Sequence, residues 1–499
     1  MKIPRILIAA PASGSGKTAI SCGLMSAFRE RGMEVRACKC GPDYIDPMFH
    51  REVLGVDSRN LDLFFSDKEE LTDGFIRHTS GADITVTEGV MGYYDGRGTD
   101  TDEGSSYDVA RTLQIPVILV VPCRGAALSL AALVRGMIGF RADSNIRGIL
   151  LNRASKMLYP RLKDMLEQEL KKSGYDIPVV GYIPEDEAFR LESRHLGLVT
   201  PQELNNLKEQ TERAGRILAE SVDLDQILSV AQAAPELEAG ETRSVHPADG
   251  YGLAENRLTG GGCSVRDGKD RKEGRKQLRI GLARDEAFCF YYKANLELLK
   301  EVGCELVSFS PLRDKKLPEN ISGLILGGGY PELYGKRLSE NRGLLDEIRR
   351  SLDAGMPCLA ECGGFMYLHE QMEDRDGNVY PLAGVIKGKT CPAGKLVRFG
   401  YVNITADKET DWLLPGETIR GHEFHYWDST DSGNDCMAVK PDGKRKWNCI
   451  HMRENMFAGY PHLYLPSMPE FARRFAVRCY EWERTRCGNC HSTGECSKK

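Results

Sequence analysis

A glycine-rich segment near the N-terminus ends in Gly16, Lys17 and Thr18. An apolar run precedes this segment and a helical pattern follows it, so we expect a strand, a loop and a helix. The backbone N–H groups of such a loop can bind phosphate. A Lys at the start of the helix can reach the β- and γ-phosphates, and the neighbouring Thr can ligate Mg²⁺. The expected ATP contacts in this segment are Ser13, Gly14, Gly16, Lys17 and Thr18.

Two further residues bear on this nucleotide site. Pro11 stands where the common phosphate-binding pattern has its first Gly, so a glycine-rich turn with a chance Lys is the alternative interpretation. The strand and helix patterns on either side favour nucleotide binding. Asn152 ends a later apolar run, where its amide could bind an adenine edge or simply cap a turn.

Acidic residues follow two other apolar runs of the first half. Asp43 and Asp46 lie in one such segment, and Glu88 and Asp95 lie in the other. The carboxyl ends of parallel strands form the ligand-binding edge of an open sheet. Mg²⁺ takes one or two carboxylates together with phosphate oxygens and water, so we expect Asp43 and Glu88 to be metal ligands. Asp46 and Asp95 are second choices, because Asp also forms turns beside Pro and Gly.

The second half offers a thiol nucleophile. Cys362 follows a short apolar run and precedes Gly363, Gly364 and an apolar helix start, an arrangement typical of a strand–nucleophile–helix turn. A helix N-terminus is expected to lower the pKa of this thiol. The N–H groups of Gly328 and Gly329, which follow another strand, could form an oxyanion hole together with that of Gly363. The alternative is that Cys362 is a buried apolar residue, since the chain has 16 Cys.

A Cys nucleophile needs a base, and three His residues are candidates. We favour His462, late in the second half, over His422 and His425, which lie in a Gly-His-Glu-Phe-His-Tyr segment. Spacing alone favours none of the three, because a single His is most often structural.

The elements that must position these residues follow an α/β pattern in both halves. In the first half the expected strands are residues 6–10, 35–38, 84–87, 116–121, 146–151 and 179–183. In the second half they are residues 278–283, 305–309, 324–326 and 358–361, with a helix over 342–354. Short apolar runs of this length are typical of strands that are buried on both faces. We therefore expect two domains, each a mostly parallel sheet flanked by helices.

Residues 233–277 divide the two domains. This stretch is rich in Gly and charge and has no hydrophobic period, so we expect a flexible linker between a domain over 1–232 and a domain over 278–484. Residues 485–499 form a polar, Cys-rich tail. Cys487, Cys490 and His491 match a haem-attachment pattern, and with Cys496 they could hold zinc or an iron–sulfur cluster. We favour a disordered tail with reduced thiols.

Composition excludes several classes of protein. The 499 residues include 67 Lys and Arg and 72 Asp and Glu, a net charge of −5, which gives no general attraction to nucleic acid or an anionic membrane. No apolar run approaches the roughly 20 residues of a membrane helix, and the first residues lack the pattern of a signal peptide. We therefore expect a cytoplasmic protein.

A nucleotide-binding half joined to a thiol-nucleophile half suggests one reaction. The thiolate attacks the side-chain amide of glutamine and releases ammonia, while ATP activates a substrate carboxylate as an acyl phosphate that ammonia then converts into an amide. A rival from another class is a non-catalytic P-loop switch related to partitioning ATPases, for which neither Cys362 nor His462 would have a use.

These residues resemble one family closely. Over residues 4–470 the chain is similar to cobyrinic acid a,c-diamide synthases, glutamine-dependent enzymes of corrin-ring biosynthesis, and this family shares Pro11. The matching motifs are APASGSGKT at residues 10–18, GPDYIDP at 41–47, EGVMGYYDG at 88–96, GGGYPE at 327–332, ECGG at 361–364 and GHEFHY at 421–426.

The resemblance implies a fold and a set of roles. It implies a dethiobiotin-synthetase-like P-loop domain and a class I glutamine amidotransferase-like domain, with Cys362 as nucleophile and His462 as the residue that activates it. The co-substrates would be ATP and L-glutamine, the metal Mg²⁺ and the substrate a tetrapyrrole polycarboxylate, and a homodimer is left open. The residues expected near the metal or the activated carboxylate are Asp43, Tyr44, Asp46, Glu88 and Asp95.

The sequence departs from the wider amidotransferase pattern at one position. Many class I amidotransferases carry an acid two residues after the His, where this chain has Tyr464. The third member of the Cys–His site is therefore unassigned. The closest rival substrates are hydrogenobyrinic acid and nickel-sirohydrochlorin. The later amidations of cobyric acid synthase are disfavoured, because that enzyme differs from the pattern at residues 421–426.

Overall fold

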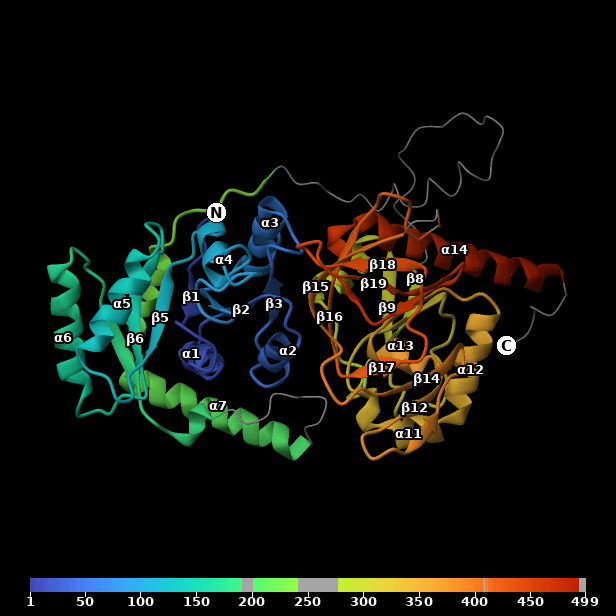
Figure 1. Ribbon diagram of the computed structural model, residues 1–499, viewed down its shortest axis with the longest axis horizontal. Coiled ribbons are helices and arrows are strands. Elements are labelled where there is room, and N and C mark those ends of the chain that lie inside the picture. The colour runs from blue at the N-terminus through green and yellow to red at the C-terminus, as the bar shows by residue number, and fades with distance from the viewer. Residues whose placement is uncertain (191–200, 241–276, 407–409, 411, 493–499) are drawn as a thin grey trace. The chain divides into compact units, whose positions relative to one another are not determined.

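The computed structural model describes residues 1–190, 201–240, 277–406, 410 and 412–492 (Figure 1). The chain divides into two compact units, Met1–Thr242 and Arg243–Lys499. Most of the expected linker, residues 241–276, lies outside the described residues, as do residues 493–499 with Cys496. Among the described residues, no helix combines the length and the apolar character that a membrane span requires.

The first unit is built on a seven-stranded sheet of order β3-β2-β4-β1-β5-β6-β7. All of its pairings are parallel. Its strands are β1 (Arg5–Ala9), β2 (Val35–Cys40), β3 (Ser58–Leu61), β4 (Ile84–Glu88), β5 (Val117–Pro122), β6 (Ile146–Asn152) and β7 (Val179–Ile183). Its helices are α1 (Lys17–Glu30), α2 (Ile45–Glu52), α3 (Lys68–Thr79), α4 (Ser106–Thr112), α5 (Ser129–Gly139), α6 (Tyr159–Lys172), α7 (Pro201–Ser221) and α8 (Leu224–Gln232).

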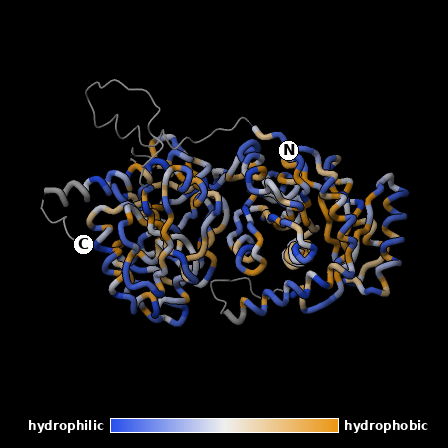
Figure 2. The backbone as a smooth tube through the Cα atoms, turned by 180° about the vertical axis from the view of Figure 1, so that it is seen from behind, coloured by the Kyte–Doolittle hydropathy of each residue, from blue (hydrophilic) through white to orange (hydrophobic). Residues whose placement is uncertain are grey.

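Successive side chains along each strand point to opposite faces of the sheet, so this unit has two hydrophobic cores. On β1, Ile6 and Ile8 face one core together with α1, α7 and α8, whereas Leu7 and Ala9 face a second core together with α3 to α6. Apolar residues on both faces explain why these strands are continuous apolar runs in the sequence. Figure 2 shows hydrophobic segments in the interior of each unit.

The first unit differs from the sequence expectation in three places. β3 was missed, because its four residues Ser-Arg-Asn-Leu carry little apolar signal. β4 extends to Glu88, so this carboxylate belongs to the strand itself. Residues 233–240 pack onto the first unit, where Arg5 Nη2 donates to the Pro235 carbonyl at 2.8 Å and the Leu237 N–H donates to the Met1 carbonyl at 3.0 Å.

The second unit contains a six-stranded sheet of order β20-β21-β11-β10-β8-β9. Its strands are β8 (Leu278–Ala283), β9 (Cys304–Phe309), β10 (Gly323–Leu326), β11 (Cys358–Glu361), β20 (His451–Arg453) and β21 (Met456–Gly459), of which only β20 is antiparallel. The helices of this unit are α10 (Lys293–Glu301), α11 (Gly335–Glu340), α12 (Arg342–Asp353), α13 (Gly363–Tyr367) and α14 (Pro469–Ser492). The last helix, α14, extends into the expected polar tail as far as Ser492.

Two smaller sheets complete the second unit, and neither was predicted from the sequence. The four-stranded one contains β12 (His369–Glu373), β13 (Val379–Pro381), β14 (Ile386–Pro392) and β17 (Trp427–Ser429). The five-stranded one contains β15 (Arg398–Thr405), β16 (Ile419–His425), β18 (Cys436–Val439), β19 (Lys446–Cys449) and β22 (His462–Leu463). Their polar, half-exposed strands lack the apolar runs that mark the parallel sheet.

Candidate active sites

The loop between β1 and α1 has the geometry of a phosphate-binding loop. Gly16 has φ 87°, a conformation that favours glycine, and a Cβ on it would lie 2.8 Å from Asn152 Nδ2. That amide donates a hydrogen bond to the Ser15 carbonyl at 2.8 Å. Asn152, at the end of β6, therefore supports the loop, and in this structure its amide is used for that bond.

Lys17 connects this loop to the loop that follows β4. Its Nζ donates to the carbonyls of Ala12 and Met91, and Met91 has the unusual φ of 48°. Burial, and then the neighbouring Lys39, lower the pKa of Lys17. The Lys17 ammonium is thus held by neutral carbonyl oxygens, and a bound phosphate could replace them as a stronger partner.

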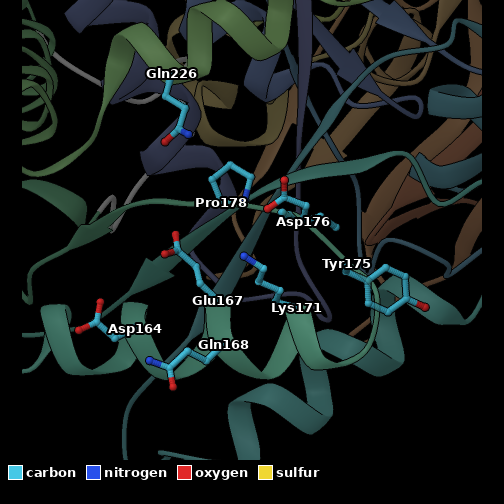
Figure 3. A pocket seen from close by; sticks show the side chains of 9 residues that line it. Asp164, Glu167, Gln168, Lys171, Tyr175, Asp176, Pro178 and Gln226 are labelled. Atoms are coloured by element: carbon cyan, nitrogen blue, oxygen red, sulfur yellow. The ribbon is translucent and has the colours of Figure 1, made fainter.

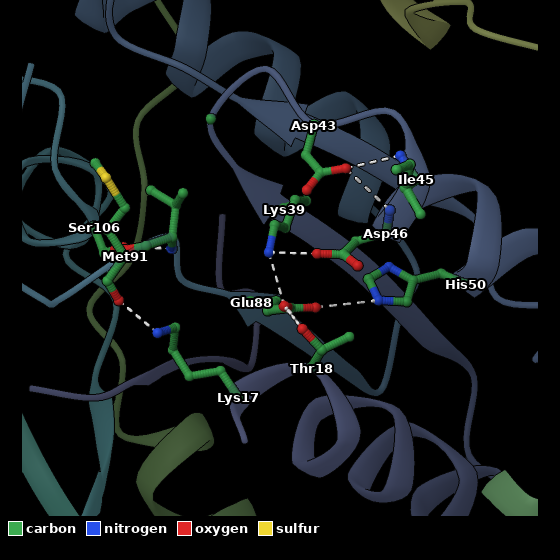
Figure 4. A network of polar contacts seen from close by, with 12 residues as sticks. Lys17, Thr18, Lys39, Asp43, Ile45, Asp46, His50, Glu88, Met91 and Ser106 are labelled. Atoms are coloured by element: carbon green, nitrogen blue, oxygen red, sulfur yellow. Dashed lines mark hydrogen bonds and ion pairs between the residues drawn. The ribbon is translucent and has the colours of Figure 1, made fainter. Parts of the chain in front are cut away.

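Glu88 is the centre of a buried polar network (Figure 4). It accepts a hydrogen bond from the Thr18 hydroxyl, lies 2.7 Å from Lys39 Nζ and 3.5 Å from His50 Nε2. Lys39 Nζ also lies 2.6 Å from Asp46. Burial by itself would raise the pKa of Glu88, but Lys39 and His50 outweigh it and hold that pKa below its usual range.

Lys39 is a site residue that the sequence analysis missed. Burial alone would lower its pKa, but Glu88 and Asp46 outweigh this effect and raise it, so Lys39 is a permanent cation in the network. A signal was available, because a Lys inside a buried strand is rare unless it is paired. Lys39 is the fifth residue of the β2 sequence Val-Arg-Ala-Cys-Lys-Cys.

The remaining acids of this region mainly hold their own loops. Asp43 Oδ1 accepts the N–H groups of Ile45 and Asp46 at 2.7 and 3.2 Å at the start of α2. Asp95 Oδ2 accepts the Gly92 N–H at 2.8 Å. Tyr44, half-buried, directly precedes α2. The structure therefore joins Thr18, Glu88 and Asp46 through shared contacts, whereas the Asp43 and Asp95 carboxylates stabilise turns.

Some of these residues are suitable ligands for a magnesium ion. The described parts of the chain contain no cluster of three or more His, Cys, Asp or Glu residues that could hold a metal ion. Mg²⁺ at a nucleotide site needs fewer protein ligands, because phosphate oxygens and water supply the rest. The Thr18 hydroxyl and the Glu88 carboxylate, which contact each other, are suitable ligands for such an ion.

In the second unit, Cys362 occupies a strained turn between β11 and α13. Its φ of 46° and ψ of −103° are unusual for a residue with a side chain, as is expected of a nucleophile turn. Its N–H donates to the Gly459 carbonyl at 2.8 Å. Gly364 lies so close to β10 that a Cβ on it would be 2.0 Å from the Leu326 carbonyl oxygen. The small residues after Cys362 are therefore needed for packing.

The predicted oxyanion glycines lie beside this turn. A Cβ on Gly363 would be 3.1 Å from the Gly329 nitrogen, and one on Gly328 would be 2.3 Å from His462 Cε1. Gly329 has φ 155°. The loop after β10 thus lies against both the nucleophile turn and the candidate base, which is where donors for a developing oxyanion must stand.

His462 is the candidate base that this loop contacts. It lies in β22, where it pairs with His422 of β16. Burial, and then His422 and His425, lower its pKa to about 3, so the imidazole is neutral, and its protonated form needs a compensating negative charge. Of the rivals, His425 stacks on Tyr460 with ring centroids 3.9 Å apart, and His422 packs edge-on against Phe399 and Tyr401.

The expectation of a lowered thiol pKa is wrong. Burial, and then the negative charge of Glu332, raise the pKa of Cys362, because the five-residue α13 does not offset the cost of a thiolate in this buried turn. The thiol therefore has to lose its proton during the reaction, so a base is required.

One acid beside His462 was also missed. Glu361, the last residue of β11, places Oε2 3.8 Å from His462 Nδ1, and its Oε1 accepts the Leu463 N–H at 3.2 Å. Burial raises the pKa of Glu361 to about 8. The available signal was a charged residue at the end of an otherwise apolar strand.

The first unit also contains a groove away from these site residues. It has a volume of about 460 Å³ and is lined by residues of α6, the segment before β7 and Gln226 of α8 (Figure 3). None of the predicted site residues lines it, and its side chains carry charges of both signs.

Comparison with known families agrees with this division of the chain. Residues 6–199 match the CobQ/CobB/MinD/ParA nucleotide binding domain, and residues 279–469 match the CobB/CobQ-like glutamine amidotransferase domain. A nucleotide-binding unit joined to an amidotransferase unit with a thiol nucleophile turn defines a glutamine-dependent ligase.

Relatives of known name match nearly the whole chain. A cobyrinate a,c-diamide synthase of Caldanaerobacter subterraneus subsp. tengcongensis is 38% identical over 96% of this chain and 99% of its own length. Another, of Clostridium acetobutylicum, is 39% identical over 92% of this chain and 96% of its own length. The chain belongs to the cobyrinate a,c-diamide synthase family.

Proposed function

We propose that this protein uses ATP and glutamine to amidate the a and c acetate carboxylates of cobyrinic acid in cobalamin biosynthesis. The observation that carries the proposal is the contact of Gly328 with His462 beside the Cys362 turn, in a chain whose other unit holds Lys17 and Thr18 in a phosphate-binding loop. The names of the relatives support the choice of substrate.

The second unit would supply ammonia. His462 accepts the thiol proton of Cys362, and the sulfur attacks the side-chain amide carbon of glutamine. The N–H groups of Gly329 and Gly363 stabilise the resulting oxyanion, and Gly328 keeps the loop against His462. The protonated His462 then donates its proton to the leaving ammonia, and water hydrolyses the thioester to glutamate.

The first unit would activate the carboxylate. Lys17 and the loop N–H groups bind the phosphates of ATP, and the γ-phosphoryl group passes to the substrate carboxylate. Ammonia attacks the acyl phosphate and displaces phosphate. Thr18 and Glu88 would hold Mg²⁺, which neutralises phosphate charge, while Asp43, Tyr44, Asp46 and Asp95 are proposed to shape the adjoining carboxylate site. Both co-substrates are abundant in the cytoplasm, where we place the reaction.

The same chemistry on hydrogenobyrinic acid or nickel-sirohydrochlorin is the second candidate. Purified protein should be incubated with each tetrapyrrole acid, Mg·ATP and glutamine. The molecular masses of the products should then be determined by mass spectrometry. We expect two successive amidations of cobyrinic acid. Nucleotide turnover without amidation of any of these acids would overturn the proposal and favour a P-loop switch.

A further inference from the structure

The glutaminase site lacks an acid where many class I amidotransferases have one. Tyr464 occupies the position two residues after His462, and its ring packs against that of Tyr292 with centroids 5.7 Å apart. A phenol in an aromatic contact offers no charge to an imidazole. If His462 gains a proton from Cys362, another group must compensate the new positive charge in this buried place.

The carboxylate of Glu361 lies close enough to do so. Its Oε2 is 3.8 Å from His462 Nδ1, and both side chains are nearly inaccessible to solvent. Its other oxygen is fixed by the N–H of Leu463, the residue that follows His462. The carboxylate is therefore anchored to β22 itself and cannot move far from the imidazole.

Two other acids of the second unit, Glu423 and Glu332, are alternatives. Glu423 lies 3.4 Å from His425 Nε2, and its Oε1 accepts the indole N–H of Trp447 at 3.2 Å. Glu332 lies in the loop after β10 and is half-buried, and its charge raises the pKa of Cys362. Among the described residues, Glu361 is thus the acid that lies within ion-pair distance of His462, with its Oε2 facing Nδ1.

We propose that Glu361, the residue before the nucleophile, is the positioning residue of the glutaminase site. This assignment rests on the proposed glutaminase activity. In the proposed site the proton of the neutral imidazole is held on Nδ1, the nitrogen that lies 3.8 Å from the Glu361 carboxylate, which leaves Nε2 as the acceptor for the Cys362 proton. When the S–H bond breaks, its proton moves to Nε2, and the imidazolium carries a positive charge that the Glu361 carboxylate balances.

In this arrangement the acid comes from a different position in the sequence, but the site still combines a Cys, a His and an acid. In the common pattern the acid follows the His on the same strand. Here it precedes the Cys on β11, and the hydrogen bond to the Leu463 N–H ties β11 to β22. Glu361 and Cys362 are consecutive in sequence, so the acid that contacts His462 directly precedes the nucleophile turn.

The test uses Glu361→Gln in the full chain. The Gln carbonyl can still accept the Leu463 N–H, so the substitution removes mainly the charge. We expect the kcat of glutamine hydrolysis to fall at least about tenfold, with the KM for glutamine within about twofold of wild type. Amidation driven by free ammonia should be unchanged, which shows that the protein is folded.

Two further variants distinguish a positioning role of Glu361 from a purely structural one. Glu417→Gln removes a half-buried carboxylate that pairs with Arg474 at 2.6 Å and should leave kcat unchanged. Glu361→Asp keeps the charge but withdraws it by one methylene, so it should retain more activity than Glu361→Gln. The assignment fails if Glu361→Gln hydrolyses glutamine as fast as wild type. If the wild type hydrolyses no glutamine at all, the proposed function itself has failed.

Discussion

Gly328 lies directly against His462, because a Cβ at residue 328 would stand 2.3 Å from the imidazole Cε1. No side chain tolerates such a contact, so either the loop after β10 or the imidazole would have to move. The relationship couples the candidate oxyanion loop to the candidate base, two segments that are far apart in the sequence.

Gly328→Ala should therefore damage glutamine hydrolysis selectively. Displacement of His462 by about 1 Å should lower kcat on the order of a hundredfold, while ammonia-driven amidation continues. Gly343→Ala in α12 is the matched control, since its Cβ would meet only the Lys315 carbonyl at an ordinary 3.5 Å. Equal activity in the two variants would show that the contact has no catalytic meaning.

Cys362→Ala should abolish glutamine-dependent amidation and leave ammonia-dependent amidation intact. The substitution removes the nucleophile but keeps a Cβ in the same strained conformation, so the turn should persist. Cys391→Ala, which alters a half-buried thiol on β14, should affect neither reaction. Product formation from each nitrogen source is the measurement, and continued glutamine use by Cys362→Ala would mean that another residue is the nucleophile.

Lys39→Met should destabilise the first unit and stop ATP-dependent amidation. It leaves Glu88 and Asp46 buried without their shared cation, at a cost of about 3–5 kcal/mol in the free energy of unfolding. Glutamine hydrolysis should survive, as the Cys362 site is built from residues of the second unit.

The control for this variant is Lys172→Met, which removes an exposed ion pair with Glu169 and should cost about 0–1 kcal/mol. Urea unfolding measures both. Similar stability of the two variants would contradict the view that Lys39 is the cation on which the buried carboxylates depend.

Glutamine hydrolysis should rise between about pH 7 and 9. Burial raises the pKa of Glu361 to about 8, so its ionised fraction grows as the pH passes through that value. Burial also raises the pKa of Cys362, which acts in the same direction. His422 and His425 face His462, and its lowered pKa keeps it neutral throughout this range.

The measurement is kcat for glutamate release across this range in the wild type and in Glu361→Gln. In the variant, the rise assigned to Glu361 should disappear and only the contribution of the thiol should remain. A wild-type profile that is flat over the range, or identical profiles in the two proteins, would contradict the prediction.

Local sequence patterns determined much of the fold. The apolar runs predicted β1, β8 and β11 to within a residue, because strands buried on both faces are mostly apolar. The short polar β3 and the two antiparallel sheets were missed, because half-exposed strands are stabilised by their neighbours rather than by their own composition.

By itself the sequence determined which residues are capable of chemistry: the phosphate-binding loop, the turn at Cys362 and the glycines beside it are contiguous motifs. Only the tertiary structure decided how they act. It placed Lys39 between Glu88 and Asp46 and set Glu361 against His462, and it raised the pKa of Cys362 where a helix terminus predicted the opposite. The physical reason is that strand neighbours and burial, which set these distances and charges, arise from segments far apart in the chain.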